Sequence, residues 1–331
     1  MPNASRLVHH ANGTTTWEDV RVEATGAEPC LIQTICTGLS RGTERLVARG
    51  MVPKELHDTM AVPGQVGTFD FPIAYGYSLV GRAVEGPPSW RGALVHLLRP
   101  HATLVTAHPG ELVRLDEEIT PVVGTMISNV ETALNAVWDA SVQPGDRVAI
   151  VGGGGLGALL AVLCQRIPGT DVLVIDPSEA VRTFGRTLGW RVHAGGVIEE
   201  DPFDVVFHTS ATAGGLSEAL RLAPEDSSVI DLSWYGSMPV AAPLGGLAHP
   251  RRVGIRLSQV GQLPLTRRAR WNFLRRRTKA AELVSSDPVW AQLLTDPVDW
   301  REAPAWFDRL REASGQATLP PGVSFLNNFV S

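Results

Sequence analysis

A glycine-rich loop between two apolar segments is the feature that most constrains how this chain folds. Five of the six residues from Gly152 to Gly157 are glycine. The apolar run Arg147–Val151 comes directly before them, and a longer apolar stretch, Leu156–Arg166, follows. These runs predict a buried strand, a tight turn and a buried helix. That order is typical of α/β folds with a parallel sheet.

The glycines match the pattern G-x-G-x-x-G at Gly152, Gly154 and Gly157. Gly152 permits the tight turn, Gly154 lets a pyrophosphate approach the backbone, and Gly157 lets the helix pack closely on the strand. The helix then presents its first backbone N–H groups, with Gly155 and Leu156 among them, and the positive end of its dipole to the phosphates. The loop therefore predicts a dinucleotide site.

Asp176 lies 19 residues after Gly157, at the end of the next strand-like run. A carboxylate there accepts hydrogen bonds from the ribose hydroxyls of the adenosine half and repels a 2′-phosphate. We therefore expect NAD as the cofactor, with NADP less favoured, although Arg182 in the following helix argues slightly for NADP. The alternative is a glycine turn with a surface Asp in an unrelated α/β fold.

Two later strand-like runs, Asp204–His208 and Val229–Leu232, should end at the same edge of the sheet, where ligands bind. Ser210 and the backbone at Leu232 and Trp234 are the cofactor contacts expected there.

Three other side chains near these strand ends allow two interpretations each. His208 is either catalytic or, as is more common for a His at the end of a buried strand, a packing and hydrogen-bonding residue. Trp234 and Tyr235 either wall the nicotinamide pocket or fill the core.

The chain has 331 residues, which exceeds the size at which one core usually stops growing. Short apolar runs broken by Gly and Pro predict a β-rich domain at 1–125. Strands alternating with helices predict a doubly wound parallel sheet at 126–285, and residues 286–331 should return to the first domain. The fold class is therefore α/β. Further predicted elements are strands at Leu31–Cys36, Ser78–Val84, Ala93–Leu98, Leu112–Leu115, Asp171–Ile175 and Val323–Phe329, and helices at Val130–Val142 and Ala303–Ala313.

Composition excludes several classes of protein. The net charge of -5 gives no general attraction to nucleic acid or an anionic membrane. The most apolar stretch, Ala158–Cys164, is far shorter than the roughly 18 residues that span a bilayer. The first residues lack a secretory signal pattern, so we expect a cytoplasmic protein. Three cysteines form neither a disulfide framework nor a four-cysteine zinc site.

A basic run at residues 267–279 carries six Arg and one Lys and no acid. It is predicted to be a solvated helix face, as most charge runs are. The alternatives are attraction of an anionic substrate or of cofactor phosphates, and a subunit contact.

The order of these segments resembles the medium-chain dehydrogenase/reductase superfamily, with its zinc-type alcohol dehydrogenase-like fold. The supporting motifs are Thr37–Glu44, Phe71–Gly81, Gln143–Val148 and the glycine loop. The resemblance implies a GroES-like catalytic domain joined to a Rossmann domain. It also implies that Val260, in the segment Ser258–Gly261, lines the nicotinamide end, and that the protein is a homodimer that acts on a small molecule.

The chain departs from the zinc-dependent members at each ligand position. The Cys of their first loop falls on Ser40, their G-H-E motif reads Gly76-Tyr77-Ser78, and their third ligand falls near Ser128 or Asn129. Hydroxyls and amides are poor zinc ligands, so we expect no zinc. The pattern resembles the zinc-free branch that includes bacteriochlorophyllide dehydrogenase. His96, His101 and His108 are expected to have scattered surface or core roles instead of forming another metal site.

Without zinc, hydrogen-bond donors must stabilise charge on the reacting oxygen. The candidates are Ser40, Tyr77 and Asn129, with Thr43 nearby, and Tyr77 is the preferred general acid/base. A phenol has a reference pKa of about 10, so the pKa of Tyr77 would need lowering for it to act as a base near neutral pH. Glu44 either orients Thr43 or pairs with a neighbouring Arg.

Three functions are compatible with these residues. The first is an NAD-dependent, zinc-independent oxidoreductase that interconverts a secondary alcohol and a ketone on a polar small molecule. The second is an NAD(P)H-dependent reductase of an activated C=C bond. The third is a catalytically silent dinucleotide-binding protein, which the hydroxyl-rich residue set argues against.

Overall fold

The computed structural model describes residues 3–22, 28–199, 202–312 and 319–327. The chain forms two compact units. Unit 1 contains residues 1–128, 274–316 and 322–331, and unit 2 contains residues 129–273 and 317–321. The chain thus returns to unit 1 at residue 274, earlier than the expected residue 286.

The helix α7 (Phe273–Ser285) explains this earlier return. Its Arg277 lies close enough to His96 of unit 1 to lower the pKa of that histidine. The carbonyl of Leu283 accepts a hydrogen bond from the indole of Trp290, on the following helix α8 (Val289–Gln292). All of α7 after Phe273 thus belongs to the β-rich unit, and Arg277 connects it to His96 there.

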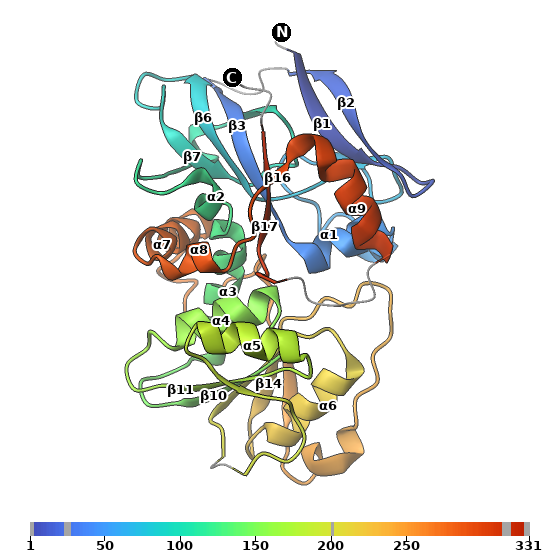
Figure 1. The fold of residues 1–331 in the computed structure, drawn as a ribbon, viewed down its shortest axis with the longest axis vertical. Helices are drawn as coiled ribbons and strands as arrows, with labels where there is room; N and C mark the ends of the chain where they lie inside the picture. The colour runs from blue at the N-terminus through green and yellow to red at the C-terminus, as the bar shows by residue number, and fades with distance from the viewer. Residues whose placement is uncertain (1–2, 23–27, 200–201, 313–318, 328–331) are drawn as a thin grey trace. The chain divides into compact units, whose positions relative to one another are not determined.

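Unit 1 is built from two sheets (Figure 1). One has the order β2-β1-β5-β4, and the other the order β16-β17-β3-β6-β7-β9, with β8 also paired to β3. All pairs are antiparallel except β16 with β17. The strands are β1 (Asn3–His9), β2 (Thr15–Arg21), β3 (Cys30–Leu39), β4 (Val66–Gly67), β5 (Ile73–Ala74), β6 (Leu79–Glu85), β7 (Leu94–Leu97), β8 (Leu104–Ala107), β9 (Val113–Arg114), β16 (Val298–Asp299) and β17 (Val323–Leu326).

Residues near both ends of the chain meet in the core of unit 1. Strand β17 pairs with β3, where Val323 lies opposite Leu39. Phe307 and Phe325 are fully buried beside Leu7, and they bring helix α9 (Ala303–Glu312) onto the first sheet. Three more helices include residues of this unit: α1 (Arg41–Ala48), α2 (Pro121–Gly124) and α3 (Ile127–Ala140), which continues into unit 2.

Unit 2 contains a six-stranded, fully parallel sheet of order β12-β11-β10-β13-β14-β15. The chain order reverses at β10, with β11 on one side and β13 on the other, and ligands bind at such a switch point. The strands are β10 (Arg147–Val151), β11 (Asp171–Ile175), β12 (Arg191–His193), β13 (Val205–His208), β14 (Ser228–Asp231) and β15 (Gly254–Leu257).

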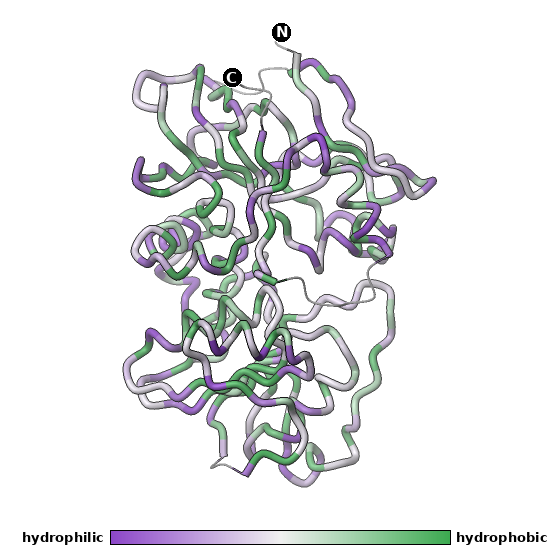
Figure 2. The backbone as a smooth tube through the Cα atoms, viewed as in Figure 1, coloured by the Kyte–Doolittle hydropathy of each residue, from purple (hydrophilic) through white to green (hydrophobic). Residues whose placement is uncertain are grey.

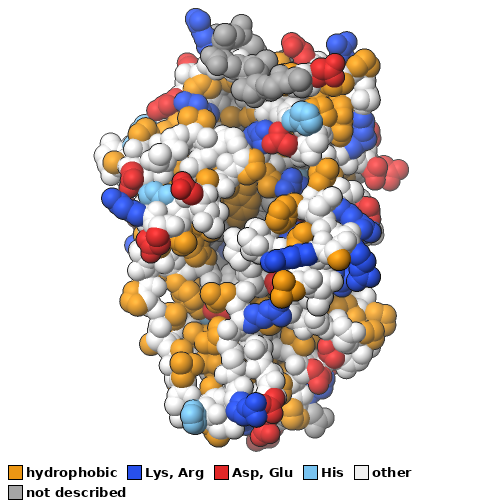
Figure 3. All heavy atoms as spheres, turned by 180° about the vertical axis from the view of Figure 1, so that it is seen from behind, with side chains coloured by type: hydrophobic (Ala, Val, Ile, Leu, Met, Phe, Trp, Pro, Cys, Tyr) orange, Lys and Arg blue, Asp and Glu red, His pale blue; other side chains and the backbone are white. Residues whose placement is uncertain are grey.

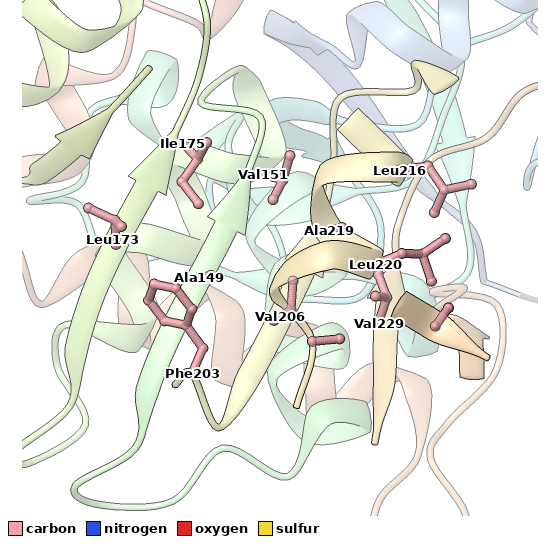
Figure 4. Packing of buried hydrophobic residues seen from close by; sticks show 12 residues of the cluster. Ala149, Val151, Leu173, Ile175, Phe203, Val206, Leu216, Ala219, Leu220 and Val229 are labelled. Carbon is pink, nitrogen blue, oxygen red and sulfur yellow. The ribbon is translucent and has the colours of Figure 1, made fainter. Parts of the chain in front are cut away.

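Apolar side chains from the sheet and from helix α6 (Ala213–Leu222) form one core of unit 2 (Figure 4). Val151, Val206 and Val229 contribute from the strands, and Leu216 and Leu220 from the helix. Helices α4 (Gly155–Cys164) and α5 (Glu179–Thr187) complete the alternation of strands and helices. The inner strands β10, β11 and β13 have mostly buried side chains and run through hydrophobic stretches of the backbone (Figure 2), as expected for strands covered on both faces.

The predicted strands at Arg147–Val151 and Asp171–Ile175 coincide with β10 and β11. The other predicted elements are present with ends shifted by a few residues. The predicted helix end at Ala313 and the end of the last strand, beyond Asn327, lie outside the described residues. The sequence analysis missed β1 and β2 and the two edge strands β12 and β15. Strands β2, β12 and β15 have several exposed or half-buried side chains and therefore give little apolar signal.

The basic run at 267–279 divides between solvent and core. Arg268, Arg270 and Arg275 are exposed, in line with the predicted solvated face. Arg276 and Arg277, however, are buried on α7, so that prediction is wrong for these two. One face of the molecule shows acidic, basic and hydrophobic side chains intermixed (Figure 3).

No helix in the described part of the chain is both long enough and apolar enough to cross a membrane. The three cysteines are buried and unpaired.

Candidate active site

Three hydroxyl groups predicted to be catalytic lie together in unit 1. Ser40 is the N-cap of α1, and Thr43 lies in the first turn of that helix. Tyr77 lies between β5 and β6, and its phenol oxygen hydrogen-bonds to the side chains of both Ser40 and Thr43. The structure therefore brings together the three hydroxyls that the sequence analysis selected.

The pKa of Tyr77 moves in the opposite direction to the one that base catalysis requires. Burial raises it to about 12, and the hydrogen bonds with Ser40 and Thr43 offset only part of that rise. The negative charge of Glu44 raises it further. The lowering that a base near neutral pH would need is not found, because burial disfavours the phenolate. Tyr77 keeps its proton near neutral pH and is suited to donate it.

Glu44 takes part in a buried network that supports this cluster. Its Oε2 lies 2.8 Å from Nε2 of His101, and its Oε1 accepts a hydrogen bond from the Ser40 N–H at 2.9 Å. Nδ1 of His101 lies 2.6 Å from the hydroxyl of Thr37. The first turn of α1 is thereby tied to His101, which the sequence analysis did not place in the site. No local signal could have found this pair, since 57 residues separate its members.

Ser78 and Ser128, two of the former metal-ligand positions, both contact the fully buried His96. Their hydroxyls lie 3.2 Å and 3.1 Å from its Nε2. The Ser78 hydroxyl donates to the carbonyl of Thr125 at 2.6 Å, and the Ser128 hydroxyl donates to that of Tyr77 at 2.7 Å. Each serine thus accepts from His96, which must carry its proton on Nε2. Burial and the nearby charge of Arg277 hold the pKa of His96 well below its ordinary value.

The donor set of unit 1 does not suit zinc. The side chains at the former ligand positions are hydroxyls and a phenol, whereas zinc prefers thiolate, imidazole and carboxylate. Among the described residues, no group of three His, Cys, Asp or Glu side chains is arranged to hold a metal ion. Asn129 follows Ser128 on α3 and is half-buried.

The glycine loop of unit 2 has the geometry that the pattern predicts. Gly152 has a φ of +106°, and a Cβ there would lie 2.8 Å from both the Ser210 nitrogen and the Thr209 hydroxyl. A Cβ on Gly157 would lie 1.8 Å from the Gly152 carbonyl oxygen, so only glycine fits. Gly154, the N-cap of α4, has open space around it. Phosphates would meet the first turn of α4 here, and this binding remains a prediction.

Asp176 is held against the glycine loop. Its Oδ2 accepts a hydrogen bond from the Gly153 N–H at 2.8 Å, and its Oδ1 accepts one from the Ser178 N–H at 2.9 Å. The guanidinium of Arg182 donates to the main-chain carbonyl of Asp176 at 2.7 Å and pairs with Glu179. The carboxylate is thus oriented beside the loop, and the Arg182 guanidinium is engaged by neighbours on its own helix and loop.

Polar side chains gather where β13 and β14 end. His208 lies between Ser210 and Asp231, 2.8 Å from the hydroxyl and 3.0 Å from the carboxylate. The Leu232 N–H donates to the His208 carbonyl at 2.9 Å, so this group, one of the predicted cofactor contacts, is already used. Trp234 and, after β15, Val260 are half-buried.

Two curated proteins of Escherichia coli (strain K12) resemble this chain over about half of its length. The uncharacterized zinc-type alcohol dehydrogenase-like protein YdjJ is 24% identical over 180 residues, which is 51% of this chain and 49% of YdjJ. D-guloside 3-dehydrogenase is 23% identical over 207 residues, which is 58% of this chain and 59% of that enzyme. The matched region thus spans less than two thirds of either relative. No family model matches the chain.

Solved structures match nearly the whole chain. A candidate zinc-binding dehydrogenase of Sinorhizobium meliloti, bound to NADP, has a TM-score of 0.76 and 18% identity and covers 99% of this chain and 100% of its own. Acetophenone reductase of Geotrichum candidum, in complex with NAD, has a TM-score of 0.76 and 14% identity and covers 100% and 99%. The chain has the medium-chain dehydrogenase/reductase fold. In this fold, unit 1 is the β-rich domain and unit 2 the Rossmann domain.

Proposed function

We propose that this protein is a zinc-independent, NAD-dependent oxidoreductase that interconverts a secondary alcohol and a ketone. The observation that carries the proposal is the Asp176 carboxylate held against the glycine loop, in a chain whose other unit gathers the hydroxyls of Ser40, Thr43 and Tyr77. The carboxylate beside the glycine loop is suited to bind a dinucleotide, and the three hydroxyls are suited to a substrate oxygen that gains or loses a proton.

The residues around Asp176 favour NAD over NADP. The carboxylate oxygens are acceptors for ribose hydroxyls, and their charge repels a 2′-phosphate. Arg182, the cation closest in sequence, is engaged by the Asp176 carbonyl and by Glu179. Two solved structures of this fold hold NADP and NAD respectively, so the fold itself accepts both.

The chemistry divides between the cofactor and the residues of unit 1. NAD(H), when bound, supplies or accepts the hydride. Tyr77 donates a proton to the carbonyl oxygen as the carbon gains hydride, which gives the alcohol. Ser40 and Thr43 contact the phenol oxygen of Tyr77 and hold it in place. The Glu44–His101 pair anchors the first turn of α1, which carries both hydroxyls.

Zinc independence follows from the same residues. The hydroxyls of Ser78 and Ser128 donate to backbone carbonyls and accept from His96, so both are committed to hydrogen bonds inside unit 1. The proton of Tyr77 takes the role that a Lewis acid has in the zinc enzymes. These features support a place in the zinc-free branch of the superfamily, near bacteriochlorophyllide dehydrogenase.

A polyhydroxylated small molecule is the substrate class that we propose. One relative that matches 58% of this chain is D-guloside 3-dehydrogenase, whose name specifies a sugar derivative.

We also propose a homodimer, because β15 is an edge strand with exposed Ile255 and Leu257 side chains, and such edges pair readily with a second chain. The unpaired, buried cysteines suit the reducing cytoplasm.

The test is a binding titration followed by a substrate screen. NADH and NADPH are titrated against the purified protein by fluorescence, and bound metal is measured by mass spectrometry. We expect NADH to bind at least tenfold more tightly than NADPH, and no stoichiometric zinc. Secondary alcohols and sugar derivatives are then screened for nicotinamide absorbance change. Tighter binding of NADPH, or one zinc per chain, would overturn the cofactor or the metal part of the proposal.

A further inference from the structure

A Ser–His–Asp constellation lies at the carboxyl ends of two strands of unit 2. Nε2 of His208 is 2.8 Å from the Ser210 hydroxyl, and its Nδ1 is 3.0 Å from Oδ1 of Asp231. His208 and Asp231 are buried, at 0% and 2% exposure, whereas Ser210 is partly exposed. A ligand can therefore reach only the hydroxyl, while the other two groups act behind it.

The hydrogen bonds determine where the His208 proton sits. Asp231 accepts from the Ser233 N–H at 2.8 Å and from the Tyr235 hydroxyl at 3.0 Å. Burial raises the pKa of Asp231, but the hydrogen bonds from His208 and Ser233 outweigh this and bring it below its ordinary value. The carboxylate is thus ionised and accepts from Nδ1 of His208. In the neutral imidazole Nε2 is then an acceptor, and the Ser210 hydroxyl donates to it.

This arrangement leaves Ser210 as an acceptor toward solvent. Its only hydrogen is committed to His208. Thr212 lies 2.9 Å away, and because the Ser210 hydrogen is committed to His208, the Thr212 hydroxyl is the donor of this pair; it also accepts from the Gly215 N–H. One lone pair of Ser210 remains for a ligand. A Cβ on Gly215 would lie 2.0 Å from the Ser210 side-chain oxygen and 2.9 Å from Nε2 of His208. Only glycine at this position of α6 therefore leaves room for the two side chains.

The constellation stands at the opposite side of β10 from Asp176. Ser210 follows β13, Asp176 follows β11, and β10 lies between these strands. The Ser210 nitrogen would be 2.8 Å from a Cβ on Gly152, so Ser210 borders the glycine loop. If Asp176 takes the adenosine ribose, the second ribose of the dinucleotide falls on the side of Ser210. Its hydroxyls are donors that match the free lone pair.

We propose that His208 and Asp231 are positioning residues that make Ser210 a directed acceptor for a hydroxyl of the nicotinamide-side ribose. The inference rests on the proposed function, since it requires a bound dinucleotide. It also explains why a His–Asp pair is kept in the interior. The same distances are also those of a Ser–His–Asp triad, so a nucleophilic Ser210 is the rival that the test must separate from this role.

The test compares three ligands that differ at the second ribose. NADH and ADP-ribose contain it, and ADP lacks it. Calorimetry on His208→Gln should show about tenfold weaker binding of NADH and ADP-ribose, and unchanged binding of ADP. Asp231→Asn, which keeps the side-chain shape, should have the same effect and guards against a folding defect in the first variant. The exposed His249→Gln is the matched control and should bind all three ligands as wild type does.

A double-mutant cycle tests whether His208 acts through Ser210. Ser210→Ala alone should weaken NADH binding by a similar factor, and His208→Gln should add nothing in that background. Equal losses for ADP, or an undiminished His208 effect without Ser210, would overturn the inference, as would labelling of Ser210 by a fluorophosphonate. Failure of the wild-type protein to bind any of the three ligands would instead refute the proposed function.

Discussion

Tyr77 illustrates how the surroundings of one side chain decide its chemical role. The position was expected to serve as general acid or base, and its burial raises the pKa to about 12. The phenol is therefore protonated over the whole range in which enzymes usually work. In our proposal it donates a proton when a ketone is reduced.

Replacing Tyr77 by Phe should remove that proton and leave the cofactor loop untouched. We expect kcat for ketone reduction to fall by about 10²–10⁴-fold, the usual contribution of a general acid. The dissociation constant of NADH should not change, because the glycine loop and Asp176 belong to unit 2. The matched control is Tyr75→Phe, since the Tyr75 ring lies only 6.1 Å from that of Tyr77. Full turnover in the Tyr77 variant would contradict its role as donor.

The pH dependence of reduction offers a second test of Tyr77. A proton donor is active below its pKa and is lost as the pH rises through that value. With a pKa raised to about 12, Tyr77 should cause no fall in kcat between pH 6 and pH 9. The profile is measured with saturating NADH and ketone. An alkaline limb near pH 8 that disappears in Tyr77→Phe would show that the pKa is lowered instead.

At the scale of elements, the turn from β10 into α4 has no room for a side chain. A Cβ on Gly157 would lie 1.8 Å from the Gly152 carbonyl oxygen, so Gly157→Ala must displace strand or helix. We expect NADH binding to weaken at least tenfold and the protein to lose about 1–3 kcal/mol of stability. Binding is measured by fluorescence titration and unfolding by urea.

The control for this substitution is Gly214→Ala, in the first turn of α6, where a Cβ meets nothing within 4 Å. Alanine is the better helix former, so this variant should keep its NADH affinity and be as stable as the wild type or more so. Tight NADH binding by Gly157→Ala would show that the loop is not the dinucleotide site.

The edge strand β15 carries the prediction of a dimer. Leu257 is 69% exposed and Ile255 is 38% exposed on a strand that pairs, within the described part of the chain, with β14 alone. A lysine at Leu257 would place a charge on the proposed interface, which disfavours edge pairing. Light scattering coupled to gel filtration should show a dimer for the wild type and a monomer for Leu257→Lys. An unchanged mass would place the interface elsewhere.

For the whole molecule, buried histidines predict loss of stability in acid. Burial lowers the pKa of His9 to about 3, with Arg311 adding to the effect. In the unfolded chain His9 has a pKa of about 6.5 and is protonated below that pH, whereas in the folded chain it stays neutral. The free energy of unfolding therefore falls as the pH drops from about 6.5 toward 3. The titration of His9 alone should lower the free energy of unfolding by about 2 kcal/mol at pH 5, relative to neutral pH. His96 acts in the same direction.

The free energy of unfolding is measured in urea between pH 7 and pH 5. His9→Phe keeps an aromatic ring beside Phe307, whose ring centroid lies 4.7 Å away, and removes the titrating group. Its stability should therefore depend less steeply on pH than that of the wild type. A variant with an unchanged slope would mean that His9 is protonated in the folded protein.

Sequence alone determined the features whose signals are local. The glycine spacing, the apolar runs on both sides and Asp176 lie within about 30 residues, and they predicted the parallel sheet, the turn and the dinucleotide loop. Ser40, Thr43 and Tyr77 were selected by their positions in motifs, and the structure brings their hydroxyls together.

Only the tertiary structure showed which distant side chains form hydrogen bonds with one another in and around the candidate sites. Glu44 meets His101 across 57 positions, Ser78 and Ser128 converge on His96, and β13 and β14 join His208 to Asp231. Such pairs leave no periodic pattern in the sequence, because the contact depends on how the intervening strands and helices fold and not on the spacing of the two residues. The direction of the Tyr77 pKa shift depended on burial for the same reason: desolvation is set by the atoms packed around a group, and those atoms come from distant parts of the chain.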